Sequence, residues 1–392
     1  MMAPLPPRLR TIVEAEYPRY SAGEMARRRT AVEAVLAEAE LDHLVFCGAN
    51  RAGSAVQWLT QWPVTAEAVG VLSPGFRDAL LVQYVNHAPL AQRLAGEAEV
   101  AWGGESSIRQ AVAVLEQRGA RAGRVGLIGP MMFEQHGALA ARFGPIVSLN
   151  RAYVGLRKVK SPEEIDWYRL GAHFSDAGMA ALRDGLRPGL TERQLGDLIE
   201  RAYVAHGGAN WIHYIGATAM RAPALAVPAQ FASTRPVEVG DVLFAEISAA
   251  FWDHPSQVLR SFALGAEPPP LYRALHAAAD AAFDAIAAAL KAGTTPQQVI
   301  DASGVIEDAG FTIVDDLLHG YGGGYFPPIL GCRSRPAGPI SDEPFSAGQL
   351  VVIQPNVVTR DGRAGVQTGE LVLITDAGIE RLHTLPRGFV RV

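Results

Sequence analysis

The division of this chain is marked by the stretch Leu156-Arg157-Lys158-Val159-Lys160-Ser161-Pro162-Glu163-Glu164-Ile165. Ser161 can cap a helix, Pro162 suits the first helical position, and Glu164 completes a capping box with Ser161. The stretch therefore predicts a linker over 157–160 and then a helix that runs from Ser161 to about Leu182. We expect a second domain, residues 156–392, to begin here.

Before this stretch, short apolar runs that favour buried strands alternate with helical segments. This alternation predicts an α/β domain over residues 21–155, preceded by a weakly ordered arm over residues 1–20. The helix at Ser21 begins with a further capping box, because Glu24 lies three residues after it. The expected elements are helices over 21–40, 90–94 and 108–118, strands over 43–47 and 124–129, and a hairpin of 68–72 with 79–82.

After the stretch, the sequence contains a weak internal repeat. The segments 188–195 and 292–299 each open a helix, and each helix is followed by a glycine-containing end. Each is then followed by a strand that opens with Gly and a polar residue, Gly240-Asp241 and Gly348-Gln349. In this register Glu246 is equivalent to Gln354. Two such units packed about a pseudo-two-fold axis would bring equivalent positions to a shared centre.

The composition excludes several classes of protein. Of the 392 residues, 49% are hydrophobic and 19% charged, which allows a large core and rules out wholesale disorder. The 35 basic and 40 acidic residues give a net charge of −5, too mild for a nucleic-acid-binding surface. The two cysteines, Cys47 and Cys332, cannot form a disulfide scaffold or a cysteine-based zinc site. With no apolar leader and no apolar run of membrane-spanning length, we expect a cytoplasmic protein without membrane or nucleic-acid partners.

The order of the motifs resembles the creatinase / aminopeptidase P / prolidase superfamily, from Ser21 to the end of the chain. The motifs are the stretch 156–165, Pro188-Gly189-Leu190-Thr191-Glu192, Val239–Leu243, His319-Gly320-Tyr321-Gly322, Phe345–Gly348 with Gln354-Pro355, and Glu370–Thr375. The resemblance implies an α/β N-terminal domain and an α+β pita-bread C-terminal domain with an internal pseudo-two-fold repeat. It also implies a homodimer in which the N-terminal domain of one subunit closes the pocket of the other.

The peptidases of that superfamily hold two metal ions with two Asp, one His and two Glu. By resemblance these five positions fall on Glu246, Gln257, His319, Gln354 and Gly369, with Glu370 one place later. Neutral Gln is a poor ligand for a two-metal centre and Gly offers no side chain, so four positive charges would face at most two carboxylates. We therefore expect the two-metal site to be lost and no cofactor to be bound. A single ion on Glu246 and His319, with or without Asp253 or His254, stays an alternative.

The resemblance to creatinase itself, which is metal-free, does not extend to its catalytic groups. The positions of those groups fall here near Ala229, on Leu259 and on Gln354. The superfamily's further His falls on Phe326. A creatine hydrolase is therefore not expected, and His319 is the one site group kept in common.

The remaining candidates for the site each have an ordinary structural alternative. Glu246 lies in an apolar strand, where an unpaired carboxylate is seldom buried, so it is expected in the pocket as a catalytic group. His319 is the second expected acid–base group, although it could be a loop residue. Cys332 has no evident base nearby, so a nucleophilic role is the minority interpretation. The substrate-binding candidates are Gln257, Gln354, His213, Tyr214, Tyr321, Tyr325, Arg333 and Glu370.

Three functional hypotheses follow. The first is a metal-independent hydrolase of a C–N bond in a small polar molecule, with Glu246 and His319 transferring protons and Gln257 and Gln354 holding the substrate. The second is a metal-dependent Xaa-Pro dipeptidase with a degraded site, or a lyase of the same fold. The third is a pseudoenzyme that binds a ligand or a protein. The first is preferred, because acids are depleted at the positions where the superfamily holds its metals.

Overall fold

The structure, a computed structural model, describes residues 4–49 and 55–392, and the chain forms two compact units. One unit comprises Glu14–Arg157, and the other comprises Met1–Val13 with Lys158–Val392. The first three residues of the expected arm lie outside the described residues. The arm is not uniformly irregular, because Pro7–Val13 forms helix α1 and groups with the second unit. No helix in the described ranges combines the length and the apolar character needed to cross a membrane.

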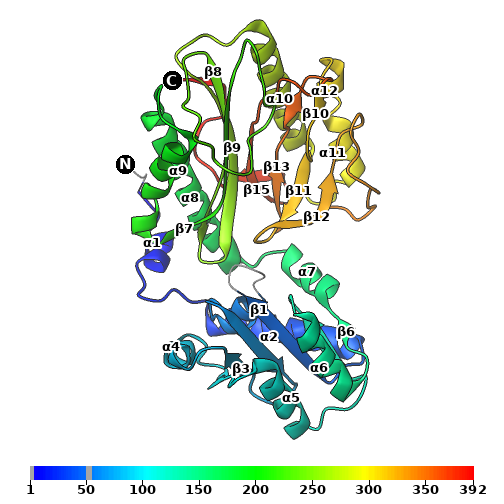
Figure 1. Cartoon of the computed structure of the whole chain (residues 1–392). Helices are drawn as coiled ribbons and strands as arrows, with labels where there is room; N and C mark the ends of the chain where they lie inside the picture. The colour runs from blue at the N-terminus through cyan, green and yellow to red at the C-terminus, as the bar shows by residue number, and fades with distance from the viewer. Residues whose placement is uncertain (1–3, 50–54) are drawn as a thin grey trace. The chain divides into compact units, whose positions relative to one another are not determined.

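The Glu14–Arg157 unit is a mixed α/β domain (Figure 1). Its six-stranded sheet has the order β4-β3-β2-β1-β5-β6, in which β1, β2 and β3 run antiparallel and the other neighbours run parallel. Apolar side chains from β1, β2, β5 and α5 form its core. Its elements are α2 (Ala22–Glu38), β1 (His43–Ala49), α3 (Ala55–Thr60), β2 (Glu67–Leu72), β3 (Ala79–Val82), η1 (Val85–His87), α4 (Ala88–Leu94), β4 (Glu99–Trp102), α5 (Ser107–Gln117), β5 (Val125–Ile128), α6 (Phe133–Phe143), β6 (Val147–Ser148) and α7 (Asn150–Lys158).

The second unit is built around a nine-stranded sheet. The main order of its strands is β12-β11-β13-β15-β9-β8-β7, with β16 on β15 and β17 on β9. Its elements are α8 (Pro162–Gly185), α9 (Glu192–Arg201), η2 (Val204–His206), β7 (Gly208–Ala219), β8 (Asp241–Phe251), β9 (His254–Ala263), α10 (Pro270–Ala289), α11 (Pro296–Ala302), α12 (Val305–Asp308), β10 (Thr312–Ile313), β11 (Leu318–Tyr321), β12 (Tyr325–Leu330), β13 (Leu350–Ile353), β14 (Val357–Val358), β15 (Gly369–Ile374), β16 (Ile379–Arg381) and β17 (Val390–Arg391).

The expected internal repeat is visible in the strand order. Read toward the middle of the sheet, β7-β8-β9 matches β11-β13-β15, with β12 added outside β11, and the two halves join where β15 pairs with β9. In Figure 1, α8 and α9 accompany the first half, and α10 to α12 accompany the second. The helix starts match as well, because Thr191 and Thr295 each cap a helix and each exchanges hydrogen bonds with a Gln three residues later. The predicted fold class is therefore confirmed.

The helix α8 begins where the opening stretch predicts. Ser161 Oγ accepts a hydrogen bond from the Glu164 backbone N–H at 3.2 Å, and the Glu164 carboxylate accepts one from the Ser161 N–H at 2.9 Å. Such a reciprocal cap satisfies two backbone donors that a helix start leaves unpaired. The buried face of α8 then packs on the sheet through Ile165, Tyr168 and Ala172.

A buried line of polar side chains connects the C-terminal segment to the sheet. Ser256 in β9 lies 2.9 Å from His383 Nε2, and His383 Nδ1 lies 2.7 Å from Asp176 Oδ1 in α8. All three side chains are buried. Asp176 also accepts from the Thr384 backbone N–H. This line connects three segments that are distant in sequence, and it stabilises the position of β9, which carries part of the site.

Candidate active site

A cavity of about 280 Å³ opens in the second unit, where the two halves of the repeat meet. Its walls come from β7, β8, β9, β11 and β12, and from the segments that follow β7, β10, β13 and β14. The lining residues are Trp211, Ile212, Tyr214, Val227, Pro228, Gln230, Glu246, Gln257, Asp315, Tyr321, Gly324, Tyr325, Asn356 and Gln367. Five of the ten residues predicted for the site therefore lie in this wall.

Four side chains form a hydrogen-bonded chain beside the cavity. Gln257 Nε2 donates to Glu246 Oε1 at 3.0 Å and to Gln354 Oε1 at 2.7 Å. Gln354 Nε2 in turn donates to Asp316 Oδ1 at 2.6 Å. The two glutamines thus connect two carboxyl groups, and they bring together Glu246 and Gln354, the positions that the repeat makes equivalent.

Both carboxyl groups of this chain are shifted toward their protonated form. Burial and the nearby charge of Asp315 raise the pKa of Glu246 to about 8. Burial and Asp315 also raise the pKa of Asp316 to about 7, against the hydrogen bonds from Gln354 and Tyr325. Because an ionised carboxylate is poorly solvated there, Glu246 keeps its proton at neutral pH. It can therefore donate a proton to a bound molecule.

The sequence reasoning missed the acidic pair Asp315-Asp316. Asp315 lines the cavity and has a φ of 70°, in the left-handed region that Asp tolerates better than most residues. Asp316 is 4% exposed and accepts the bond from Gln354. Two consecutive acids directly before the strand that carries His319 are the signal that could have pointed to them.

Two amide side chains of the wall were also missed, namely Asn356 and Gln367. Each is 1% exposed, and in each the side-chain oxygen has no hydrogen-bond partner. Gln367 also donates a hydrogen bond to Glu246. Nothing in the sequence distinguishes these two residues from ordinary buried amides.

His319 lies behind the cavity wall. It is fully buried, and its ring stacks on Tyr325 with the ring centres 3.8 Å apart. Its Nδ1 is 2.9 Å from the Gly320 carbonyl oxygen, and the ring also interacts with the Gln354 side chain. Burial lowers the pKa of His319 to about 4, so the imidazole is neutral at neutral pH. In this state it can accept a proton but has no excess proton to donate.

The aromatic candidates divide into two groups. Tyr214, Tyr321 and Tyr325 line the cavity, and the Tyr325 side chain is half exposed at its mouth. His213, by contrast, is held 2.6 Å from the Tyr203 hydroxyl by its Nε2. Burial lowers the pKa of His213 and keeps it neutral. Because β7 places Tyr214 on the cavity side, its neighbour His213 points away.

The strand register explains why Glu370 cannot replace the missing carboxylate at Gly369. Gly369 pairs with Leu259, two residues along from Gln257, so it shares the face of Gln257. Glu370 pairs with Val258 and lies on the opposite face, where its carboxylate binds Arg260 at 2.8 Å and also Arg381. A Cβ at Gly369 would meet the Ile353 carbonyl oxygen at 2.4 Å. Glu370 is therefore part of an ion pair, not of the cavity wall.

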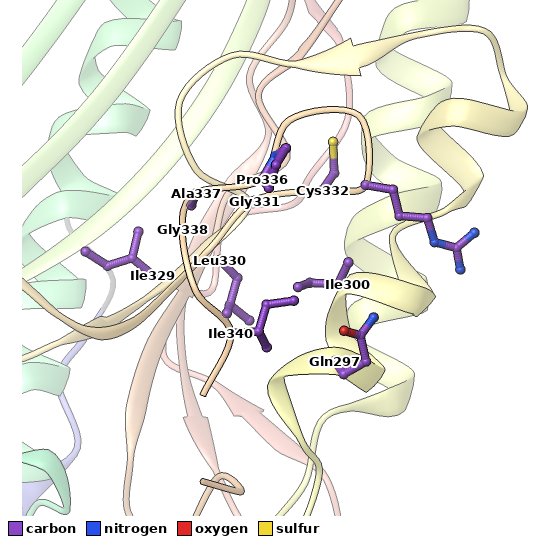
Figure 2. Close-up of a pocket in the computed structure, with 11 residues that line it drawn as sticks. Gln297, Ile300, Ile329, Leu330, Gly331, Cys332, Pro336, Ala337, Gly338 and Ile340 are labelled. Atoms are coloured by element: carbon purple, nitrogen blue, oxygen red, sulfur yellow. The ribbon is translucent and has the colours of Figure 1, made fainter. Parts of the chain in front are cut away.

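Arg333 belongs to a second cavity, of about 270 Å³, together with Cys332. Figure 2 shows Leu330, Ile300 and Ile340 gathered in it. Arg333 binds Asp301 at 3.2 Å, and Cys332 Sγ lies 3.2 Å from Ser334 Oγ. This cavity shares no lining residue with the first one.

The positions that the resemblance assigns to metal ligands do not fit two divalent ions. Gln257 and Gln354 are neutral and bonded to each other, Gly369 has no side chain, and His319 is behind the wall. Within residues 4–49 and 55–392, no group of three or more His, Cys, Asp or Glu is arranged to hold a metal ion. Two such ions need several anionic ligands. The residues at these positions therefore do not form a two-metal centre.

Curated relatives of this chain carry the names of peptidases. A probable dipeptidase PepE of Mycobacterium tuberculosis is 27% identical over 250 residues, which are 60% of this chain and 61% of the relative. The protein of the same name from Mycobacterium bovis matches equally. The alignment thus spans less than two thirds of these relatives.

Solved structures match the fold over nearly the whole chain. An Xaa-Pro dipeptidase from Bacillus anthracis has a TM-score of 0.79 at 18% identity, covering 94% of this chain and all of the other. An X-Pro aminopeptidase from Thermotoga maritima has a TM-score of 0.80 at 18% identity, with 93% and 99% covered. Dipeptidase PepE from Mycobacterium ulcerans has a TM-score of 0.77 at 24% identity, with 95% and 99% covered. At these identities the likeness establishes the fold alone.

A family match corrects two expectations of the sequence analysis. The sequence model of metallopeptidase family M24 matches residues 166–376, more than half of the chain. The expectation of a metal-independent hydrolase that is not a peptidase is therefore wrong. The expectation that no metal cofactor takes part is also wrong, because the family is one of metallopeptidases. The sequence reasoning inferred the chemistry from local ligand losses and gave the family too little weight. By this match, the chain belongs to metallopeptidase family M24.

Proposed function

We propose that this protein is a peptidase that hydrolyses short peptides in the cavity beside Glu246. The observation that carries the proposal is the hydrogen-bonded chain Glu246–Gln257–Gln354–Asp316, whose first three members fall at positions that the resemblance assigns to the site of the family's peptidases. The peptidase names of the relatives support the same class of reaction. A volume of about 280 Å³ suits a small substrate.

In this proposal water attacks the peptide carbonyl carbon, Glu246 supplies a proton to the leaving amine nitrogen, and the proton that the water loses returns to the Glu246 carboxylate. Hydrolysis of an amide requires this step, because an unprotonated amine anion is a very poor leaving group. Glu246 suits it, since its raised pKa of about 8 keeps the carboxyl group protonated at neutral pH. Gln257 holds the Glu246 carboxyl group in place, and Tyr214 and Tyr325 position the substrate.

The test is a cleavage assay with a panel of dipeptides, including Xaa-Pro members, followed by mass spectrometry. It is run with and without added Mn²⁺, because the family is metal-dependent. We expect cleavage of at least one dipeptide, and Glu246→Gln should lower the rate about 100-fold or more. Asp342→Asn, a change of an exposed acid that lines neither cavity, is the matched control and should leave the rate unchanged. A folded protein that cleaves no peptide in either condition would refute the proposal.

We also propose, from the family resemblance, that the protein is a homodimer. Tyr325 and Ile329 on edge strand β12 are each about half exposed, which leaves apolar surface for a partner to cover. Light scattering at several protein concentrations measures the mass, and a monomer at all of them would contradict the proposal.

A further inference from the structure

The second cavity is an apolar space that the proposed peptidase function does not use. Its volume is about 270 Å³, and it is walled by α11, the end of β12 and the loop that follows β12. Figure 2 shows Ile300 of α11, Leu330 of β12 and Ile340 of the loop gathered in it. A volume of this size suits a small molecule.

Part of the apolar wall of this cavity is exposed to solvent. Ile329 and Ile340 line it, and they are 46% and 44% exposed. A ligand with a hydrocarbon group would remove this surface from water, which is the main favourable term in apolar binding. The wall therefore favours a ligand with a compact hydrocarbon side chain.

Two opposite charges lie side by side next to this apolar wall. Arg333 lines the cavity, and its Nη2 donates to Asp301 Oδ1 at 3.2 Å. Gln297, which also lines the cavity, donates to the same oxygen at 3.1 Å. The Arg333 and Asp301 side chains are both more than half exposed, so their pair contributes little to stability and can rearrange around a ligand.

This pair of charges is a poor partner for a ligand that carries a single charge. Asp301 would repel a carboxylate bound to Arg333, and Arg333 would repel an ammonium group bound to Asp301. An α-amino acid carries both charges on one carbon atom, so each of its groups finds an opposite charge. Arg offers N–H donors in a planar fork to a carboxylate, and a carboxylate accepts from an ammonium group.

We propose that the second cavity binds a free α-amino acid with an apolar side chain, such as leucine. The ligand's carboxylate pairs with Arg333, and its ammonium group pairs with Asp301. Its side chain packs against Ile300, Leu330 and Ile340. The assignment does not depend on the proposed function, although cleavage of peptides would release ligands of this class.

The test measures binding to the full-length protein by calorimetry, apart from any cleavage. Besides leucine, the probes are isocaproate, which lacks the ammonium group, isoamylamine, which lacks the carboxylate, and serine, which lacks the apolar side chain. We expect leucine to bind, and each of the other three to bind about tenfold more weakly or less, because each loses one of the three contacts.

Variants of the protein place the ligand in one of the two cavities. Arg333→Gln should weaken leucine binding about tenfold or more, because the carboxylate loses its cation. Ile340→Asp puts a charge on the apolar wall and should abolish binding. Arg335→Gln changes an exposed arginine that lines neither cavity, and it is the matched control that should leave binding unchanged. Glu246→Gln, a change in the first cavity, should also leave it unchanged.

Four results would overturn the assignment. Absence of leucine binding at millimolar concentration would remove the site. Binding of isocaproate or isoamylamine as tight as that of leucine would show that one of the two charges is not recognised, and equal binding of serine would exclude the apolar wall. Unchanged leucine binding in folded Arg333→Gln and Ile340→Asp variants, or its loss in Glu246→Gln, would place the ligand outside the second cavity. None of these results bears on peptide cleavage, which the dipeptide assay tests separately.

Discussion

Two glutamates of the central sheet, Glu370 and the partly buried Glu246, have opposite surroundings. Glu370 in β15 is fully buried and binds both Arg260 and Arg381. Burial alone would raise the pKa of Glu370, but the hydrogen bonds and charges of these arginines lower it below its ordinary value. Among the described residues no arginine pairs with Glu246 in β8, so burial and the nearby charge of Asp315 raise the pKa of Glu246 to about 8.

The difference shows that the charge state of a buried carboxyl group depends on its partners more than on its depth. Where the sheet supplies cations, the acid is ionised and stabilises the fold. Where it supplies only amides and further acids, the acid is protonated and available to a ligand. The site and the ion pair are separated by the pleat of the sheet, because Gln257 and Arg260 project from opposite faces of β9.

Removing the acid of the ion pair should have the largest effect. In Glu370→Gln the guanidinium of Arg260, which is 2% exposed, loses its counter-charge. Such an uncompensated buried charge is destabilising by about 3–5 kcal/mol. Urea denaturation at neutral pH measures the change in the free energy of unfolding. A change below about 1 kcal/mol would mean that the two glutamates do not differ in the way described.

Replacing Glu246, the acid of the cavity, should raise the free energy of unfolding, whereas replacing Glu370 lowers it. The pKa of Glu246 is raised from an ordinary value of 4.5 to about 8, so its ionisation opposes folding. The stability of the wild-type protein is penalised progressively as the pH rises from about 4.5 to about 8. Glu246→Gln lacks this term, so its stability relative to wild type should increase across this window by about 2–4 kcal/mol. A pH series of urea titrations on both proteins measures the difference, and a flat difference would contradict the raised pKa.

The second arginine of the ion pair should matter less than its acid. The Arg381 side chain is 42% exposed, so solvent screens its attraction to Glu370, and Arg260 remains as a partner. We expect Arg381→Ala to lower the free energy of unfolding by about 1 kcal/mol. Added salt should reduce this effect, and a loss as large as that of Glu370→Gln would show that Arg381 carries the pair.

The smallest effect is expected at Arg333, which the sequence analysis assigned to the substrate. It lines the second cavity and binds Asp301, and its side chain is 57% exposed. Arg333→Ala should leave peptide cleavage unchanged and stability within about 0.5 kcal/mol. A large loss of cleavage would return Arg333 to the site and would connect the two cavities.

The parts of the fold that local residues determine could be predicted from sequence. Ser161 with Glu164 fixes the start of α8, and Thr191 and Thr295 fix the two equivalent helix starts. These are predictable because a cap involves side chains within three residues of each other. The helical character of residues 7–13 was missed, since its start carries no such cap.

The site was predictable only as far as strand pairing within the repeat could be inferred. Glu246, Gln257 and Gln354 were placed correctly together, because equivalent positions meet at the centre of the repeat. Glu370 was misplaced because a shift of one residue along a strand reverses the face, and only the register with Val258 decides it. Asp315, Asn356 and Gln367 were missed because their burial depends on contacts that are distant in sequence.

The polar line Ser256–His383–Asp176 has the hydrogen-bond order of a serine hydrolase triad, and this suggests a use in chemical labelling. Ser256 is fully buried and lies outside both cavities described above, so a fluorophosphonate should not react with it in the native protein. Reaction would require β9 and the C-terminal segment to separate. The rate of labelling at Ser256 would therefore report how often this part of the sheet opens.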